Sequence, residues 1–262
     1  MAIATELNVV ETTDANLIAS TIFGDGVSIV SATLTGAATQ AGIYTGADTT
    51  TPGTAPSDGG VILSTGNVGD YTNSDGSTNT NTAAGTSTNH AGAADADLTA
   101  LGGNTSFDAV IFEALFVPTG DFLTMQFTFS SEEYLEYTNE GVNDTLGVWV
   151  NDTFVPLLPT GETVSIDTIN DGINSDFYVD NPAGTDPYNT EMDGFTITLT
   201  MTAPVLTGAQ NKIKIGLADG GDGAYDSNVL IAGDSIQTVV VAIEDTITLE
   251  ANDTLVVDIL AN

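Results

Sequence analysis

The chain has 262 residues, 41% of them hydrophobic, which is enough for one large β domain or two smaller ones. Its formal net charge is −34, with only two basic residues, and this excludes nucleic-acid binding because phosphate recognition depends on Lys and Arg. The charge also disfavours anionic membranes, and the absence of cysteine excludes disulfides and thiol chemistry.

Acidic residues in such excess repel one another unless salt or bound divalent ions screen them. We therefore expect a secreted protein in saline, calcium-containing water, with adaptation to high salt as the alternative. The first residues form neither the basic nor the apolar segment of a signal peptide. No run reaches the ~20 apolar residues of a membrane span, so we expect no direct membrane insertion and export without an N-terminal signal peptide.

The N-terminal part of the chain predicts one short helix in ANLIASTIFG, capped by Asp14, with Leu17, Ile18, Ile22 and Phe23 on one face. Gly-bounded strands are expected at 27–34, around Tyr44 and at 59–66. Residues 67–105 are rich in Asn, Thr, Ser and Gly and predict a long polar loop, in which the one histidine, His90, is expected to be solvated.

Short apolar runs between turn residues continue to the end of the body. The strand candidates are 109–117, 122–129, 146–150, 153–157, 163–166, 177–179, 195–201, 212–217, 229–231 and 235–242. About a dozen short strands predict an all-β fold, an antiparallel, jelly-roll-like β-sandwich over residues 1–242. Trp149 lies in an apolar run and is expected in the core, not on a sugar-binding surface.

Residues 243–262 form a C-terminal extension with alternating apolar stretches at 246–249 and 255–260. Three interpretations stay open. The stretches complete the domain's own sheet, begin a further module, or add as a strand to a neighbouring molecule. The last interpretation predicts a homo-oligomer or polymer that forms through this extension.

The stretch 127–147 runs from an apolar strand into acids and amides, and no basic residue is near in the sequence. Crowded carboxylates need a counter-charge, and oxygen donors without Cys or clustered His favour calcium. The candidate Ca²⁺ ligands here are Glu132, Glu133, Asn143 and Asp144. The alternative is a solvated acidic loop.

Two further acidic segments are candidate ligand sources. The Gly-rich segment 219–228 offers Asp219, Asp222, Asp226 and Asn228, and the segment 167–193 offers Asp180, Glu191 and Asp193. Neither has the spacing of an EF-hand or of a nonapeptide β-roll. Asp and Gly are also good turn formers, which is the alternative explanation for both segments.

Several motifs in order resemble the choice-of-anchor L family: GVILSTG, FSSEEY, NDTLGVWVN, FYVDN with EMDGFT, and YDSNVLIAGDSIQT. The resemblance covers roughly residues 7–242. It implies a bacterial β-sandwich that is extracellular or presented at the cell surface, and it brings no catalytic residues. The final segment EDTITLEANDTLVVDILAN resembles the entry strand of cadherin-like or Ig-like repeats.

Taken together, these features predict a non-enzymatic, calcium-stabilised structural or adhesive protein that assembles into a surface fibre or biofilm matrix. One alternative is a monomeric module that binds carbohydrate, such as a cell-surface glycan. Another is a glycoside hydrolase that uses Glu132 and Glu133. Adjacent residues on an extended strand point to opposite faces, which disfavours that carboxylate pair.

Overall fold

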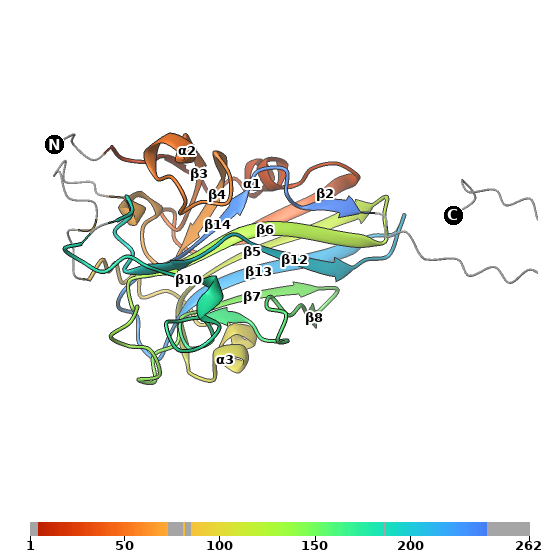
Figure 1. Ribbon diagram of the computed structural model, residues 1–262. Coiled ribbons are helices and arrows are strands. Elements are labelled where there is room, and N and C mark those ends of the chain that lie inside the picture. The colour runs from red at the N-terminus through yellow and green to blue at the C-terminus, as the bar shows by residue number, and fades with distance from the viewer. Residues whose placement is uncertain (1–4, 73–80, 82–84, 186, 240–262) are drawn as a thin grey trace, which may run out of the picture.

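Two antiparallel β-sheets face each other and enclose the core (Figure 1). The computed structural model describes residues 5–72, 81, 85–185 and 187–239. The nine-stranded sheet contains, in spatial order, β1 (Asn8–Glu11), β3 (Ala41–Thr45), β4 (Gly59–Ser64), β14 (Ser227–Ala232), β6 (Phe122–Ser131), β11 (Gly194–Thr196) and β10 (Tyr178–Asp180), and β12 (Leu199–Pro204) and β15 (Gln237–Val239) also pair with β6.

The six-stranded sheet is built around β5 and β13. It contains, in order, β2 (Val27–Thr35), β5 (Ser106–Pro118), β13 (Asn211–Gly220), β7 (Thr145–Val150) and β8 (Thr153–Phe154), with β9 (Val164–Ser165) paired to β7. The prediction of an all-β antiparallel sandwich is confirmed. The predicted strand at 195–201 is two strands, β11 and β12, which pair with different parts of β6.

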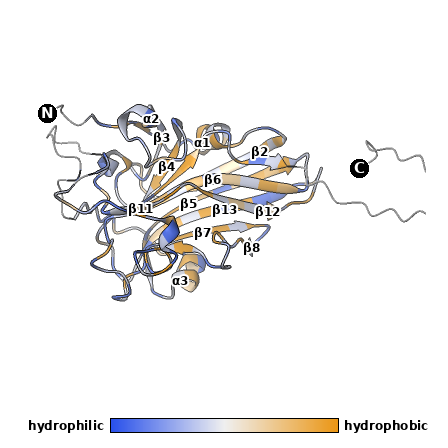
Figure 2. Ribbon diagram, viewed as in Figure 1, coloured by the Kyte–Doolittle hydropathy of each residue, from blue (hydrophilic) through white to orange (hydrophobic). Residues whose placement is uncertain are grey.

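Side chains alternate between core and surface along the strands, as the period of two requires. In β13, Ile213, Ile215 and Leu217 are fully buried in the main core cluster. Figure 2 shows hydrophobic residues along β4, β6 and β7 in the middle of the molecule. Trp149 is half-buried on the outer face of the six-stranded sheet, so its predicted place in the core was wrong.

Helix α1 (Ala15–Ile22) confirms the predicted N-terminal helix. The Asp14 carboxylate caps it by accepting the backbone N–H groups of Asn16 and Leu17, at 3.0 and 3.2 Å. Ile18 and Ile22 are buried, whereas Leu17 is 44% exposed and does not share their face. The helix contacts β2 of one sheet and β4 of the other, and so closes one side of the sandwich.

The sequence missed the helical segments α2 (Ala47–Thr50), α3 (Ala96–Gly102), η1 (Val68–Tyr71) and η2 (Ser175–Phe177). Two of them, η1 and α3, lie in the predicted polar loop 67–105. Asp95 caps α3, Leu98 is its one buried residue, and Gly103 ends it in the left-handed conformation. With a single buried residue, α3 is too short to produce an apolar period in the sequence. None of the helices in the described residues is long and apolar enough to cross a membrane.

Lys214 attaches α3 to the six-stranded sheet. Its ammonium lies 2.8 Å from Asp95 and 2.7 Å from Asp97, and 4.9 Å from the centre of the Trp149 ring. The Lys214 side chain is only 11% exposed. Lys212, two residues earlier, pairs with Glu113 and Asp152 and is 38% exposed.

We expect Lys214→Met to lower the free energy of unfolding by about 2 kcal/mol, because it leaves Asp95 partly buried without its cation. The matched change Lys212→Met removes a solvent-exposed ion pair and is expected to cost less than about 1 kcal/mol. Urea denaturation of both variants measures the difference. Equal losses would contradict the role assigned to Lys214.

Candidate metal centre

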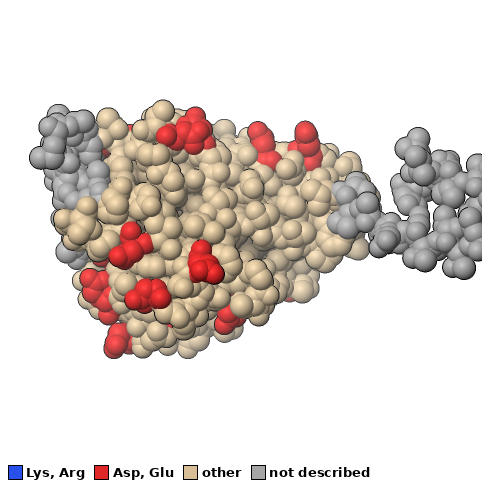
Figure 3. Space-filling view, viewed as in Figure 1, with Lys and Arg blue, Asp and Glu red and all other residues tan. Residues whose placement is uncertain are grey.

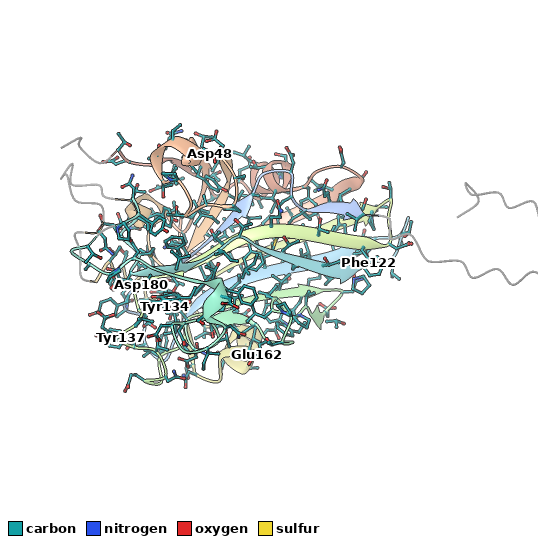
Figure 4. All side chains as sticks on the ribbon, viewed as in Figure 1. Asp48, Phe122, Tyr134, Tyr137, Glu162 and Asp180 are labelled. Atoms are coloured by element: carbon teal, nitrogen blue, oxygen red, sulfur yellow. The ribbon has the colours of Figure 1, made fainter. Side chains whose placement is uncertain are left out.

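Acidic loops from distant parts of the sequence meet at one end of the sandwich. Strand β6 ends at Ser131 where β14 begins at Ser227, and these two residues are paired. Strand β13 ends beside the start of β7, where Ala218 pairs with Thr145. The loops 132–144 and 221–226 therefore lie together, and Figure 4 shows Tyr134, Tyr137 and Asp180 at this same end.

Glu132 and Glu133 have different acidic neighbours. Burial raises the pKa of Glu132 to about 8, and the charges of Asp193 and Glu191 raise it further. Burial likewise raises the pKa of Glu133, with Asp144 as the strongest of its charged neighbours. We call Glu132, Glu191 and Asp193 the Glu132 group, and Glu133, Asp144 and Asp219 the Asp144 group.

The Asp144 group lies between the sheets. Asp144 is fully buried; its Oδ1 accepts the Gly220 N–H at 3.0 Å and its Oδ2 accepts the Ser227 hydroxyl at 2.6 Å. These two hydrogen bonds lower its pKa, but burial outweighs them and the pKa rises to about 7.

Asp219 is the least satisfied acid of this group. It is 1% exposed, and neither of its carboxylate oxygens has a hydrogen-bond partner. Burial and the charge of Asp144 raise its pKa well above the usual range, and the nearby Thr65 hydroxyl opposes this without forming a hydrogen bond of normal geometry. Glu133 Oε2 and the buried Tyr134 hydroxyl are also without partners.

Asp226 lies next to the Asp144 group and is 3% exposed. Its Oδ1 accepts the Thr88 N–H at 2.9 Å, its Oδ2 has no partner, and burial raises its pKa to about 7. A Cβ atom at Gly66 would lie 1.8 Å from that Oδ2, so only glycine fits there. Asn228 Oδ1 and Ser130 Oγ, on paired residues of β14 and β6, are likewise buried without partners.

In the Glu132 group, Glu132 Oε1 accepts the Thr86 N–H at 2.7 Å and Oε2 has no partner. Burial raises the pKa of Asp193 to about 6, and Asn81 donates to its Oδ1 at 2.9 Å. Glu191 is 5% exposed. A cavity of 450 Å³ lies beside Asp193 and Asp180.

Three predicted ligands have other bonds or lie at the surface. Asp222 is exposed, and its carboxylate accepts the Ala224 N–H, as in an Asx turn. Asp180 is exposed and accepts the Tyr178 hydroxyl at 2.9 Å. The Asn143 side chain accepts the Asp167 N–H and donates to the Gly102 carbonyl, both at 3.3 Å.

Sequence reasoning missed Asp108, which is 1% exposed near the same end and accepts the backbone N–H groups of His90 and Gly92. A single acid inside an apolar strand gave no signal. His90 itself is half-buried, and its Nε2 is buried without a partner, so its predicted solvation was wrong.

No cation of the described chain neutralises these acids, because Lys212 and Lys214 pair with other carboxylates on the six-stranded sheet. Figure 3 shows acidic side chains and no lysine on one whole face. Within residues 5–72, 81, 85–185 and 187–239, no three His, Asp or Glu side chains are grouped closely enough to hold a metal ion. An ion here would therefore use two carboxylates with neutral oxygens, or require side chains to rotate.

In a chelator, we expect the free energy of unfolding to fall as the pH rises from about 4 to about 8. The folded pKa values of Asp226, about 7, and Glu132, about 8, exceed the values near 4 of the unfolded chain. The folded state therefore binds more protons in this range. The contribution of these groups to stability is fully present below pH 4 and is lost as they ionise.

Urea denaturation at several pH values measures this slope, which each such group steepens by up to about 1.4 kcal/mol per pH unit. Glu132→Gln is expected to flatten the slope, and Asp234→Asn, at an exposed position, serves as the control. If both variants kept the slope of the unchanged protein, the burial of Glu132 would not be its cause.

Comparison with known proteins gives one match. The family model described as "Choice-of-anchor L domain" matches residues 6–237, which confirms the resemblance noted in the motifs. Comparison with curated proteins and with solved structures finds no match. Since the model covers most of the chain, the protein belongs to the choice-of-anchor L family of surface-associated bacterial proteins.

Proposed function

We propose that this chain is a non-enzymatic, calcium-stabilised structural or adhesive module of the bacterial cell surface. The observation that carries the proposal is Asp219, a carboxylate buried to 1% exposure with both oxygens unpartnered. An isolated buried charge is strongly unfavourable, so this group is either protonated or bound to a cation.

Calcium suits the Asp144 group better than other cations. It takes six to eight oxygen ligands at about 2.3–2.6 Å in flexible geometry, so it accepts a mixed set of carboxylates, hydroxyls and carbonyls. Asp219 and Glu133 offer unpartnered carboxylate oxygens, and the Tyr134 hydroxyl is unpartnered as well. Bound calcium would replace the protons that burial otherwise holds on these acids.

The Glu132 group is proposed as a second, weaker calcium site. Glu132 Oε2, Ser130 Oγ and Asn228 Oδ1 are buried oxygens without partners near the β6–β14 pair. Glu191 and Asp193, whose charges act on Glu132, supply further carboxylates. Asp222 and Asp180 lie at the exposed rims and would serve as outer ligands only after their present hydrogen bonds are broken.

A glycosidase is disfavoured by the placement of its only candidate pair. Two catalytic carboxylates must face one cleft on either side of the scissile bond. Glu132 and Glu133 are 2% and 1% exposed. The strongest charged neighbour of Glu132 is Asp193, whereas that of Glu133 is Asp144. Turnover of a glycan that Glu132→Gln abolishes without unfolding the protein would overturn this part of the proposal.

We also propose that residues 243–262 mediate self-assembly into a fibre or biofilm matrix. These residues lie outside the described part of the chain. Support comes from the sequence, where alternating apolar stretches at 246–249 and 255–260 are suited to pairing with another sheet.

A second candidate function is binding of a cell-surface glycan. The 450 Å³ cavity beside Asp180 and Asp193, walled by Leu135, Pro182 and Ala183, is the observation in its favour, since calcium held at its acidic rim would coordinate sugar hydroxyls. A glycan array probed in millimolar calcium tests this function. If no glycan on the array binds, glycan binding is contradicted and the structural role remains as the one proposed function.

We expect 1 mM calcium to raise the free energy of unfolding by about 1.4 kcal/mol over the value in chelator, for a dissociation constant of about 10⁻⁴ M typical of extracellular modules. The Asp219→Asn variant is expected to lose most of this gain. Thermal melting measures both proteins, and terbium luminescence excited through Tyr134 and Tyr137 reports ion binding directly.

Asp234→Asn is the matched control, because this exposed acid follows the end of β14 that lies away from the acidic loops, and the variant should keep the calcium effect. Magnesium at the same concentration should stabilise less, because it demands a rigid octahedral site. A protein whose melting is indifferent to chelator, with no terbium signal, would contradict the calcium proposal and leave the acids as an adaptation to salt.

A further inference from the structure

An apolar groove runs between the two sheets at the edge formed by β12 and β8. The end of β7 and strand β8, with Phe154 and the following Pro156, provide one wall, and the end of β12 with Val205 and Leu206 provides the other. The groove has a volume of 350 Å³, and none of its lining residues is charged. Leu206 is 61% exposed. We call this feature the β12 groove.

The two sides of the sandwich are closed differently. On one side α1 contacts strands of both sheets and buries Ile18 and Ile22 between them. On the side of the β12 groove, β12 pairs with β6 and, within the described residues, with no further strand. An unpaired edge beside an apolar groove is the arrangement to which an added strand binds, through main-chain hydrogen bonds and alternate side chains.

Other edges of the sandwich are less suited to such addition. Strands β8 and β10 have two and three residues. Strand β2 is long, but a β-bulge between Ile29 and Ser31 interrupts its register. Strand β12 has six residues in regular register with β6, from Leu199 to Pro204.

The chain's own C-terminal extension has the composition of a donor strand. Its stretch 255–260, LVVDIL, matches β12 in length and has one charged residue, Asp258. In a chain of net charge −34, the uncharged β12 groove is a surface where an acidic segment meets no lining carboxylate. The two lysines of the chain do not line it.

The register of β6 places the last described residue of the chain, Val239, near the groove. Val239 pairs with Phe122 on one side of β6, and Pro204 pairs with the same Phe122 on the other. Val239 therefore lies two strand spacings, about 10 Å, from the end of β12. Residues 240–254 are more than enough to connect that point with a neighbouring molecule at about 3.3 Å per residue.

From these positions we propose that residues 255–260 of a second copy of this chain add as a strand to β12 and fill the β12 groove. The inference rests on the self-assembly proposed above and names its acceptor site. Each copy carries one donor stretch and one acceptor groove, so head-to-tail addition of one copy to the next leaves a free groove and a free donor stretch at the two ends of the assembly, as growth of a fibre requires.

Single cysteines test this directly, because the natural chain has none. Thr202→Cys, at an exposed position of β12, is prepared in one full-length protein and Val257→Cys in another. We expect a disulfide-linked heterodimer when the two are mixed and oxidised. Leu17→Cys, on the exposed face of α1, replaces Thr202→Cys in the control and should form at least tenfold less heterodimer.

The double variant Thr202→Cys with Val257→Cys separates exchange between copies from docking within one chain. A disulfide formed only inside the monomer at all protein concentrations would overturn the proposal in favour of a strand that closes its own groove. Absence of any specific Thr202–Val257 disulfide would overturn the groove as the acceptor.

A charge in the groove tests the same contact without cysteines. Leu206→Glu should shift assembly measured by sedimentation velocity to at least tenfold higher protein concentration, and Leu17→Glu, the matched exposed apolar position, should not. Deletion of residues 243–262 decides the self-assembly proposal itself. If deletion abolishes assembly and Leu206→Glu does not alter it, only the groove inference fails; if deletion leaves assembly unchanged, both fail.

Discussion

Burial of carboxylates without a counter-charge is the constraint around which one end of this molecule is built. Asp144, Asp219 and Glu133 are removed from water between two sheets, and the only two cations of the chain are engaged elsewhere. Backbone N–H groups and hydroxyls satisfy some of the oxygens, as Gly220 and Ser227 do for Asp144. The remaining charge must be removed by protons or by a bound cation, and the choice between the two links stability to pH and to calcium.

The antiparallel topology is what brings these acids together. Strands β6, β13 and β14 each carry an ordinary apolar core along their length and place an acid just inside or just beyond their ends. Since β6 is paired with β14 and β13 with β7, the loops that follow them open at one end of the sandwich. The loop 85–92 then crosses this end and donates N–H groups to Glu132, Asp226 and Asp108. Stability of that loop is therefore coupled to the ionisation of the acids beneath it.

The sequence predicted the sandwich well because strand period and turn residues are local signals. It also predicted the N-terminal helix, whose cap and apolar face are adjacent in the chain. The helix α3 was missed because only Leu98 of its residues is buried, and its anchor, Lys214, is more than a hundred residues away.

The acidic site could be predicted in composition but not in geometry. Asp219 and Asp226 were singled out from one acidic segment; the structure places Asp219 near the end of β13 and Asp226 just before β14, and both are buried. Asp222, in the loop between them, faces solvent, and Asp108 comes from a different strand, β5. Which acids are buried depends on cross-strand register, such as the pairing of Ser131 with Ser227, and no local pattern encodes it.

The position of the two lysines has a consequence for survival outside the cell. Lys212 and Lys214 both lie in β13, which is hydrogen-bonded to β5 on one side and β7 on the other. A protease that cuts after lysine or arginine must draw an extended, accessible stretch of chain into its active site, and here that stretch is the middle of a sheet. Digestion by such enzymes would require the six-stranded sheet to open first, so the folded body presents a trypsin-like protease with no loop that it can cut.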